Sequence, residues 1–533
     1  MSLPSELNFA LALLPALLMA AAALWSRCSA VPVPRLWHRF HVLAWAALAF
    51  SLLALISQLA LVRAYSVAGA GADMWLAANQ FGAWVSLLVQ LLGTAIGVFS
   101  STHLQGEPRQ PVYIAALAGV LAAVHFLLLA NHWIVLIAAW AAIEYAMDFL
   151  LCFYRDRPFA LLAAHKKRVT DRAADVLLIA AAAFAWVQVG SGSLSALWTY
   201  AAAGHAASPL LTVSAICLVL AVIARTALMP VHGWLVQVME APTPVSALLH
   251  AGVVNLGGYV LVLFAPLLAG ALFARWLLVV FGLVSAVVAG LVLLTRVSQK
   301  VHLAWSTIAQ MGFMVLECGL GLYLFAALHL LGHSLYKAHN FLAASSAVRD
   351  CSRKLITGPV ENSWLSMLLA VPATLAIVFG IQFLTGGRGW PWWWSAVLAL
   401  AWAPLLWVPK PSPERKGVLA ARLTVALASA VLLTFAGWIV DHAPVGAGER
   451  PLAAAGVVAL AGMAAMYLGM VLLQLWPRAV IEVRRWVYAG FYMDEGYTHW
   501  VLRICPTHWA AAGHTSGRAP SILRERAYRT SEP

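Results

Sequence analysis

Charged side chains are scarce in this sequence. Asp, Glu, Lys and Arg together make up 10% of its 533 residues, whereas soluble domains carry about 25%. Hydrophobic residues make up 63%. A water-soluble fold of this composition would expose large apolar patches and aggregate. The shortage of charge therefore excludes an ordinary soluble enzyme and indicates a membrane protein.

The usual motifs of covalent chemistry are also missing. The six cysteines are isolated and form no CxxC pair, so a disulfide framework, a zinc ribbon and an iron–sulfur cluster are not expected. No GxGxxG, P-loop or HExxH pattern occurs, which removes the common signals for a nucleotide or a hydrolytic metal. We therefore predict a chain that is not an enzyme and holds no cofactor or metal of its own.

Apolar residues come in blocks near 20 residues long, the length that a helix needs to cross about 30 Å of hydrocarbon. Runs of alternating polarity, which mark a membrane β-barrel, are not found. The predicted fold class is therefore an all-α polytopic membrane protein with about 15 transmembrane helices. The predicted spans are 7–25, 40–62, 78–100, 111–129, 132–151, 173–190, 210–229, 244–266, 276–294, 303–322, 325–348, 363–384, 393–408, 423–440 and 452–475.

Lysine and arginine are unequally distributed between alternate loops. With the N-terminus placed outside, the loops that then face the cytoplasm hold 19 of the 33 basic residues, and the outer loops hold four. Eight more lie in the tail after residue 475, which the same count places inside. We therefore expect an outside N-terminus and a cytoplasmic C-terminus. The net charge of +13 is scattered over short loops, so the lipid bilayer is the expected surrounding and no nucleic-acid partner is expected.

Ionisable residues inside hydrophobic spans are the candidate functional residues, because each costs at least about 2.5–3.5 kcal/mol in the hydrocarbon. Pro230 follows Arg225, one of these residues, and must break or kink its helix. The candidates before the eleventh span are Glu144 and Asp148 in the fifth span, Arg225 in the seventh, His250 in the eighth and Glu317 in the tenth.

The eleventh span carries the richest pattern. His329, His333 and Lys337 recur every four residues and form one stripe on a helix. The HxxxH spacing could bind a metal, but no third ligand is visible nearby and Lys337 would repel a cation. A titratable relay fits better, because His changes charge near neutral pH and a buried lysine can lose its proton.

A structural role is the alternative for each of these residues taken singly. A lone His or Glu in a membrane bundle can satisfy backbone groups at a helix break or pair with a neighbour. Asp148, for example, could cap the inner end of its helix with Arg155. The presence of seven such residues in one bundle favours ion transfer.

Several motifs, in order, resemble the antiporter-like subunits of respiratory complex I and of Mrp cation/proton antiporters. The segment from Arg225 to Tyr259, with PVHGWLVQVMEAPTPVSALLHAGVVNLGG, is similar to the signature of that family. The further matches are RVTDRAAD (168–175), KVHLAWSTIAQMGFM (300–314), HLLGHSLYKAHNFLAASS (329–346) and GFYMDEGY (490–497).

This resemblance implies a fold of two inverted five-helix repeats, at about 110–266 and 276–408, each with a broken helix that exposes backbone groups to ions. It implies the following division: N-terminal transmembrane helices (1–109), a first repeat (110–270), a second repeat (271–410), C-terminal transmembrane helices (411–477) and a cytoplasmic amphipathic and basic tail (478–533). It also implies roles for single residues. Glu144 matches the buried glutamate of the family, and His250 and Lys337 match its relay positions. Asp148, Asp175, Lys300 and Pro230 are expected in structural or secondary roles.

Two departures from the family pattern alter the expected route. The lysine of the seventh helix is replaced by Arg225, which can hold Glu144 ionised in an ion pair but cannot release its proton. The twelfth span contains no ionisable residue where the family keeps an exit, so Glu317 is the candidate outlet. The expected pathway runs through Glu144, Arg225 and His250, then along His329, His333 and Lys337 to Glu317.

Within the family, the HGWLVQVMEAPTPVSALLHAGVVNLGG segment and the short C-terminal region resemble the DabB-type subunits of bacterial inorganic-carbon transporters. That resemblance implies a multi-pass protein of the inner membrane. It implies a cytoplasmic DabA-type partner, a zinc β-carbonic-anhydrase-like subunit, and places the zinc on that partner. It further implies that a flow of H+ or Na+ through this chain energises uptake of CO2 as bicarbonate.

Two other functions stay open at this point. The chain could be a proton-pumping or antiporter subunit of a complex I-like, hydrogenase-like or Mrp-type complex, or a membrane scaffold that conducts nothing. The segment 478–500 could dock the partner or lie on the membrane surface, since its amphipathic pattern suits both.

Overall fold

The computed structural model describes residues 3–28, 31–64, 74–205, 207–346, 362–385, 390–410, 416–441, 450–476 and 478–507. Within these ranges the chain is helical, and β-structure is limited to three isolated bridges. The predicted all-α class is confirmed. The helices are α1 (Leu3–Cys28), α2 (Val33–Ala64), α3 (Gln80–His103), α4 (Gln110–Leu128), α5 (Trp133–Leu151), α6 (Pro158–Val189), α7 (Leu194–Tyr200), α8 (Pro209–Arg225), α9 (Gly233–Gln237), α10 (Thr243–Leu248), α11 (Leu256–Leu263), α12 (Ala265–Gly270), α13 (Leu272–Leu293), α14 (Gln299–Leu320), α15 (Tyr323–Leu342), α17 (Trp364–Leu384), α18 (Trp392–Trp402), α19 (Lys416–Asp441), α20 (Ala453–Leu475), α21 (Ile481–Tyr488) and α22 (Met493–Ile504).

Twelve helical segments of the described chain are long and apolar enough to cross a membrane, counting α10 and α11 together as Thr243–Leu263. Two shorter apolar helices, Pro209–Arg225 and Trp392–Leu406, accompany them. The helix α15 is also long, with 20 residues, but its histidines and lysine make it less apolar. Each predicted span overlaps one of these helices, so the pattern of apolar runs located the bundle correctly.

The sixth span is longer than predicted. The helix α6 has 32 residues and begins at Pro158, whereas the prediction began it at 173. Its first half carries Lys166 and Lys167, which the loop count treated as exposed, yet both side chains are buried. The hydropathy pattern did not identify this half as part of the helix, because hydropathy assigns charged residues to water. Here the two lysine charges are neutralised by carboxylates of the chain.

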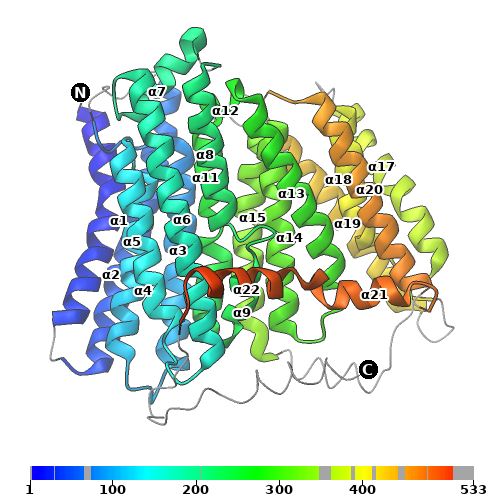
Figure 1. Ribbon diagram of the computed structural model, residues 1–533, viewed down its shortest axis with the longest axis horizontal. Coiled ribbons are helices and arrows are strands. Elements are labelled where there is room, and N and C mark those ends of the chain that lie inside the picture. The colour runs from blue at the N-terminus through cyan, green and yellow to red at the C-terminus, as the bar shows by residue number, and fades with distance from the viewer. Residues whose placement is uncertain are drawn as a thin grey trace.

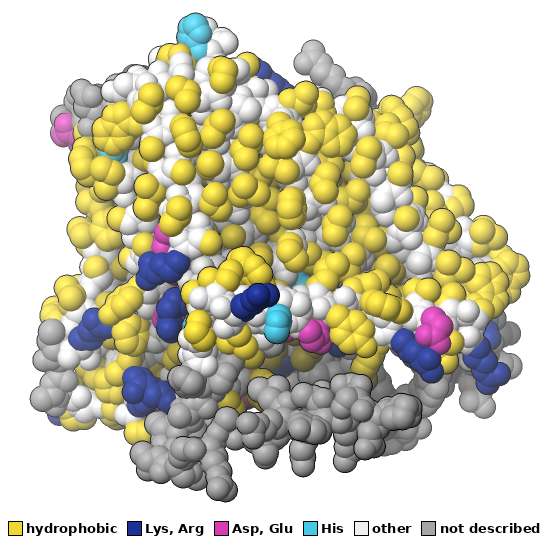
Figure 2. Space-filling model, in the orientation of Figure 1, with side chains coloured by type: hydrophobic (Ala, Val, Ile, Leu, Met, Phe, Trp, Pro, Cys, Tyr) yellow, Lys and Arg dark blue, Asp and Glu magenta, His cyan; other side chains and the backbone are white. Residues whose placement is uncertain are grey.

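The helices stand side by side in a broad row that follows the sequence from α1 at one side to α17–α20 at the other (Figure 1). The helices α21 and α22 run across this row, near one end of the other helices. Figure 2 shows most Lys and Arg side chains of this face at that same end, below a wide apolar surface. This is the end that the loop charges predict to be cytoplasmic.

The first expected repeat contains a broken helical segment. The helix α8 ends at Arg225, before Pro230, and α10 is separated from α11 by a short π-helical turn, Leu249–Val253. In the second expected repeat, α17 continues without a break through Pro372. The division into two inverted repeats and the five predicted segments stays a prediction.

The helices α13 and α14 pack closely against each other. A β-carbon on Gly282 would lie 2.7 Å from the carbonyl oxygen of Gly312 and 2.7 Å from the backbone nitrogen of Leu316. A β-carbon on Gly312 would likewise meet the backbone nitrogen of Ala286 at 2.6 Å. Since small residues allow helix backbones to approach, these glycines hold α13 and α14 against each other.

We expect Gly282→Leu to destabilise the protein by about 1–3 kcal/mol, because the new side chain must push α13 away from α14. The matched control is Gly380→Ala on α17, where a β-carbon meets nothing within 4 Å. The thermal unfolding midpoint of the purified protein in detergent measures both. Equal midpoints for the two variants would contradict the close packing.

Candidate functional site

The first buried cluster joins α5 to α6. Lys167 forms an ion pair with Glu144 on α5, and its ammonium also lies 2.6 Å from the carboxylate of Asp171, one turn further along α6. The side chain of Lys167 is 1% exposed. Its ammonium lies 5.4 Å from the ring centre of Trp234, which closes the cluster on another side. A lysine held between two carboxylates can exchange partners without leaving the protein interior.

Arg225 lies beside this cluster with a different partner. Its guanidinium pairs with Asp175 on α6 and lies 4.5 Å from the ring centre of Trp140. The expected ion pair between Glu144 and Arg225 is therefore corrected: Glu144 pairs with Lys167. The reason is that the first half of α6 buries Lys167 next to Glu144, whereas Arg225 lies next to Asp175. Arg225 keeps its charge and cannot shuttle a proton.

The remaining residues with expected secondary roles lie around this cluster. Asp148 pairs with Arg168 at 3.0 Å, so the expected contact with Arg155 is corrected to a neighbour on α6. Asp175 forms an ion pair with Arg225, and its structural or secondary role stays a prediction. Pro230 lies in the connection after α8, and Lys300 lies in the first turn of α14.

Lys166, next to Lys167, connects the cluster to the C-terminal helices. Its side chain is fully buried; it pairs with Asp494 on α22, and its ammonium donates to the hydroxyl of Thr498 at 2.7 Å. The second oxygen of Asp494 accepts a hydrogen bond from Gln237 at 3.0 Å. A β-carbon on Gly233 would collide with Asp494, so only glycine allows this approach of α9 to α22.

His232 lies next to this contact, in the connection between α8 and α10. Its side chain is fully buried and its two ring nitrogens have no hydrogen-bond partner. Its ring lies 5.1 Å from that of Trp305 on α14. Burial lowers the pKa of His232 to about 4, so the ring is uncharged near neutral pH. It lies between the first cluster and α14.

The second group of polar residues surrounds the break between α10 and α11. His250 lies in the π-helical turn; its Nδ1 is 3.1 Å from the hydroxyl of Thr307, and its ring stacks on Phe341. Lys337 is fully buried, and its ammonium donates to the carbonyl oxygen of Leu303 at 2.9 Å. No ion pair among the described residues includes Lys337, so its positive charge is costly to bury.

His333 is the connecting member of the stripe on α15. Its side chain is buried and neither ring nitrogen has a hydrogen-bond partner. It lies within electrostatic reach of Lys337, His329 and His250. The stripe predicted from the sequence is thus brought together with His250, on one side of α15.

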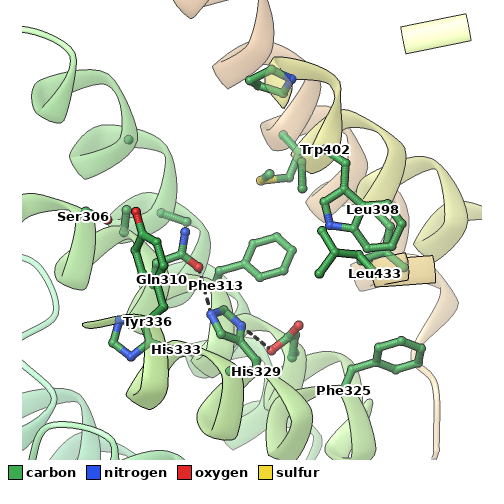
Figure 3. Close-up of a pocket in the computed structure, with 18 of the residues that line it drawn as sticks. Ser306, Gln310, Phe313, Phe325, His329, His333, Tyr336, Leu398, Trp402 and Leu433 are labelled. Carbon is green, nitrogen blue, oxygen red and sulfur yellow. Dashed lines mark hydrogen bonds and ion pairs between the residues drawn. The ribbon is translucent and has the colours of Figure 1, made fainter. Parts of the chain in front are cut away.

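The stripe ends at a cavity of about 650 Å³ between α14, α15 and the helices α18–α20. His329 lies in its wall (Figure 3). One of its ring nitrogens is 2.9 Å from Glu317 and the other is 2.9 Å from Gln310. The opposite wall is apolar and includes Leu398, Trp402 and Leu433. Glu317 and His329 are therefore the polar edge of a space large enough for several water molecules.

No metal site accompanies these residues. Among the residues that the structure describes, no three His, Cys, Asp or Glu side chains are grouped so that they could hold a metal ion. His329 uses both ring nitrogens on Glu317 and Gln310, and the ammonium of Lys337 lies on the same stripe. The arrangement suits exchange of protons between neighbouring groups better than binding of a metal.

Comparisons with known proteins agree with this arrangement. The model of the family described as "NADH:quinone oxidoreductase/Mrp antiporter, TM" matches residues 130–400, which contain both polar clusters. The chain belongs to that family. The family resemblance seen in the sequence motifs is confirmed.

Relatives within the family include inorganic carbon transporter subunits. The chain is 35% identical over 460 residues to the "Probable inorganic carbon transporter subunit DabB" of Hydrogenovibrio crunogenus, covering 81% of this chain and 86% of the relative. It is 40% identical over 341 residues to the DabB2 subunit of Halothiobacillus neapolitanus, covering 62% of each chain. The similarity to DabB-type subunits is thereby confirmed over most of the sequence.

A solved structure of the same family shares the fold. The chain superposes on a chain of the Mrp complex from Dietzia sp. DQ12-45-1b with a TM-score of 0.54 and 22% identity. The match covers 97% of this chain and about half, 55%, of the other. The two chains therefore share a similar helical arrangement.

The sequence missed three participants in the site: Lys166, Lys167 and His232. The two lysines stand immediately before the RVTDRAAD motif, at positions that the hydropathy pattern assigned to a loop. Two features of the sequence could have indicated that these lysines are buried. They directly precede the family motif, and Asp171 follows Lys167 by one helical turn. His232 was inside the quoted signature, but nothing in one sequence distinguishes it from its neighbours.

We expect Asp494→Asn to lower the stability of the protein by about 2–3 kcal/mol, because it leaves the buried ammonium of Lys166 without its carboxylate. The loss lies below the range for fully buried pairs, since the Asp494 side chain is 27% exposed. Glu495→Gln, at the exposed neighbouring position, is the matched control and should change stability by less than about 0.5 kcal/mol. Thermal unfolding in detergent measures both.

The double variant Lys166→Asp with Asp494→Lys tests the same pair from the other side. It restores opposite charges, so it should be more stable than either single reversal. A double variant as unstable as the sum of its single changes would show that the two side chains do not interact.

Proposed function

We propose that this chain is the cation-conducting membrane subunit of an inorganic-carbon uptake complex, and that the cation is the proton. The flow of protons through the chain energises conversion of CO2 to bicarbonate by a partner subunit that resembles a zinc β-carbonic anhydrase. The similarity to DabB-type subunits supports the carbon-uptake part of this proposal. The family supports cation translocation.

One observation carries the proton-conducting role: exchangeable groups gather along one side of α15, where the ring centres of His329 and His333 lie 6.2 Å apart and His329 bonds Glu317. The fully buried side chains of His250 and Lys337 belong to the same group. Lys337 has no carboxylate partner in the described chain, and His333 has free ring nitrogens. Groups in this state can accept or release a proton with little rearrangement. Groups with a purely structural role would instead have all their hydrogen-bond and ion-pair partners within the protein.

The two clusters would work in sequence. When Lys167 pairs with Glu144, its positive charge is drawn toward α5; when it pairs with Asp171 alone, Glu144 is free to take up a proton. The change in charge near α8–α10 then alters how readily His250 is protonated, because nearby like charges disfavour the charged form. The proton passes along the stripe on α15 and leaves through the cavity at Glu317.

The partner is proposed to dock at the end of the bundle that carries α21, α22 and most of the loop cations. This proposal includes the cytoplasmic orientation of that end and the location of the complex in the inner membrane. The catalytic zinc would be held by the partner. A complex I-like or Mrp-type assembly is the competing function, and the composition of the purified complex distinguishes the two.

We expect Glu144→Gln to reduce inorganic-carbon uptake at least tenfold, because the neutral amide cannot exchange a proton or balance Lys167. The variant Glu6→Gln, which removes an exposed carboxylate in the first turn of α1, is the matched control and should keep normal uptake. Uptake is measured as intracellular bicarbonate in cells that depend on this complex. Normal uptake by an assembled Glu144→Gln complex would contradict the proposed proton pathway.

Lys337→Ala should abolish uptake in the same way, since it interrupts the stripe between His250 and His333. The complex should still assemble, because Lys337 makes a single hydrogen bond, to a backbone carbonyl. Co-purification of partner subunits with the variant measures assembly. Full uptake by this variant would support a scaffold that conducts nothing.

A purification of the tagged chain from mild detergent tests the partner. We expect one main partner that contains zinc and a carbonic-anhydrase-like sequence. Redox subunits or further antiporter-like subunits in its place would assign the chain to a respiratory or Mrp-type complex. Proteomic identification and a zinc assay of the same sample give the answer.

A further inference from the structure

A second cavity, of about 1080 Å³, lies where α20 passes into α21. It is separate from the cavity at Glu317, and none of the proposed proton-carrying residues lines it. Its walls are the residues that follow α13, the first turn of α17, the end of α20 and the segment that leads into α21. It therefore lies at the end of the bundle where α21 crosses the other helices (Figure 1).

The charged side chains of this cavity are all basic. Lys410, Arg478 and Arg484 line it, and no Asp or Glu is among its described lining residues. Arg478 and Arg484 form no ion pair with a carboxylate of the described chain, whereas the neighbouring Arg485 pairs with Glu482 at 2.7 Å. No carboxylate of the described residues neutralises these two guanidinium groups, so they can bind an anion.

Aromatic side chains place this cavity at the depth of the lipid headgroups. Trp364 begins α17 and Trp476 follows α20, and both line the cavity with exposed fractions of 60% and 57%. Tryptophan is enriched at the boundary between hydrocarbon and water, where its ring meets apolar chains and its N–H meets polar groups. The basic side chains lie at the same helix ends.

The cavity also has polar and apolar walls suited to an amphiphile. Asn362 donates to Gln474 at 2.9 Å across the gap between α17 and α20, and both amides line the cavity. Met367 and Leu473 line it on the apolar side. One wall can therefore donate hydrogen bonds to phosphate oxygens while the other contacts an acyl chain.

The helix α21 is built to lie on a membrane surface beside this cavity. Val487 is buried, and Arg296 lies 5.5 Å from the ring centre of Tyr488, which fixes the helix to the end of α13. Ile481, Val483 and Trp486 remain exposed. An amphipathic helix with exposed apolar and basic side chains lies in the interface of a bilayer and prefers anionic lipid.

We propose that this cavity binds the phosphate-bearing headgroup of an anionic phospholipid, held by Arg478 and Arg484. Basic pockets between transmembrane helices on the cytoplasmic side are suited to such headgroups. A free inorganic oxyanion would fill only a small part of the volume and would leave the apolar wall without a partner. The lipid would connect α17, α20 and α21 at the membrane surface.

The test uses the purified complex, stripped of lipid in detergent. Phosphatidylglycerol is titrated against it, with phosphatidylcholine and inorganic phosphate as separate arms. Bound lipid is counted by native mass spectrometry, and the thermal unfolding midpoint is followed. We expect phosphatidylglycerol to bind and raise the midpoint, and neither phosphatidylcholine nor inorganic phosphate to match it.

The variant Arg478→Gln with Arg484→Gln should weaken phosphatidylglycerol binding about tenfold or more. The matched control, Arg485→Gln with Arg503→Gln, removes the same charge from α21 and α22 outside the cavity and should bind like the unmodified protein. Equal binding of both lipids, or equal protection by inorganic phosphate, would overturn the proposal. Loss of a partner subunit in the first variant with unchanged lipid binding would also overturn it and make the cavity a protein-docking site.

Discussion

Two consecutive lysines, buried where water cannot solvate them, set the constraint on which the candidate site depends. Lys166 and Lys167 lie on α6 and point to different neighbours, because adjacent residues of a helix are about 100° apart. Lys167 is balanced by Glu144 and Asp171 within the bundle, and Lys166 by Asp494 on α22. The C-terminal helices are therefore part of the electrostatic balance of the transmembrane site, although they lie across its end (Figure 1).

The second polar group has the opposite character. Around Lys337 and His333 the chain supplies few carboxylates and several unpaired nitrogens, so charge there is poorly compensated. In the first cluster buried charges are neutralised by ion pairs, and in the second group an added charge would find little compensation. A device that moves protons needs both properties in sequence, since a path of saturated ion pairs would trap the charge and a wholly apolar path would exclude it.

The fold and part of the site could be predicted from the sequence, and the rest of the site could not, for physical reasons. Apolar runs located the fifteen long or apolar helical segments of the described chain, because hydrocarbon demands about 20 apolar residues. The stripe of His329, His333 and Lys337 was predictable because helical spacing alone aligns it. The partner of Glu144 was not, because several cations and carboxylates lie within a turn of one another and only packing selects the pair. The charged first half of α6 was missed because hydropathy counts charges without seeing their partners.

The glycine contact between α13 and α14 has a mechanical consequence. The two backbones touch at Gly282 and Gly312, so sliding of one helix along the other would cause collisions. The helix α14 supplies the atoms that face the stripe and His250: the carbonyl of Leu303 and the side chains of Gln310 and Glu317 face the stripe, and the hydroxyl of Thr307 faces His250. The helix α14 is thus held in register with α13, and we expect a conducting cycle to proceed by rotamer changes of α15 side chains against it, without sliding of α14 along α13.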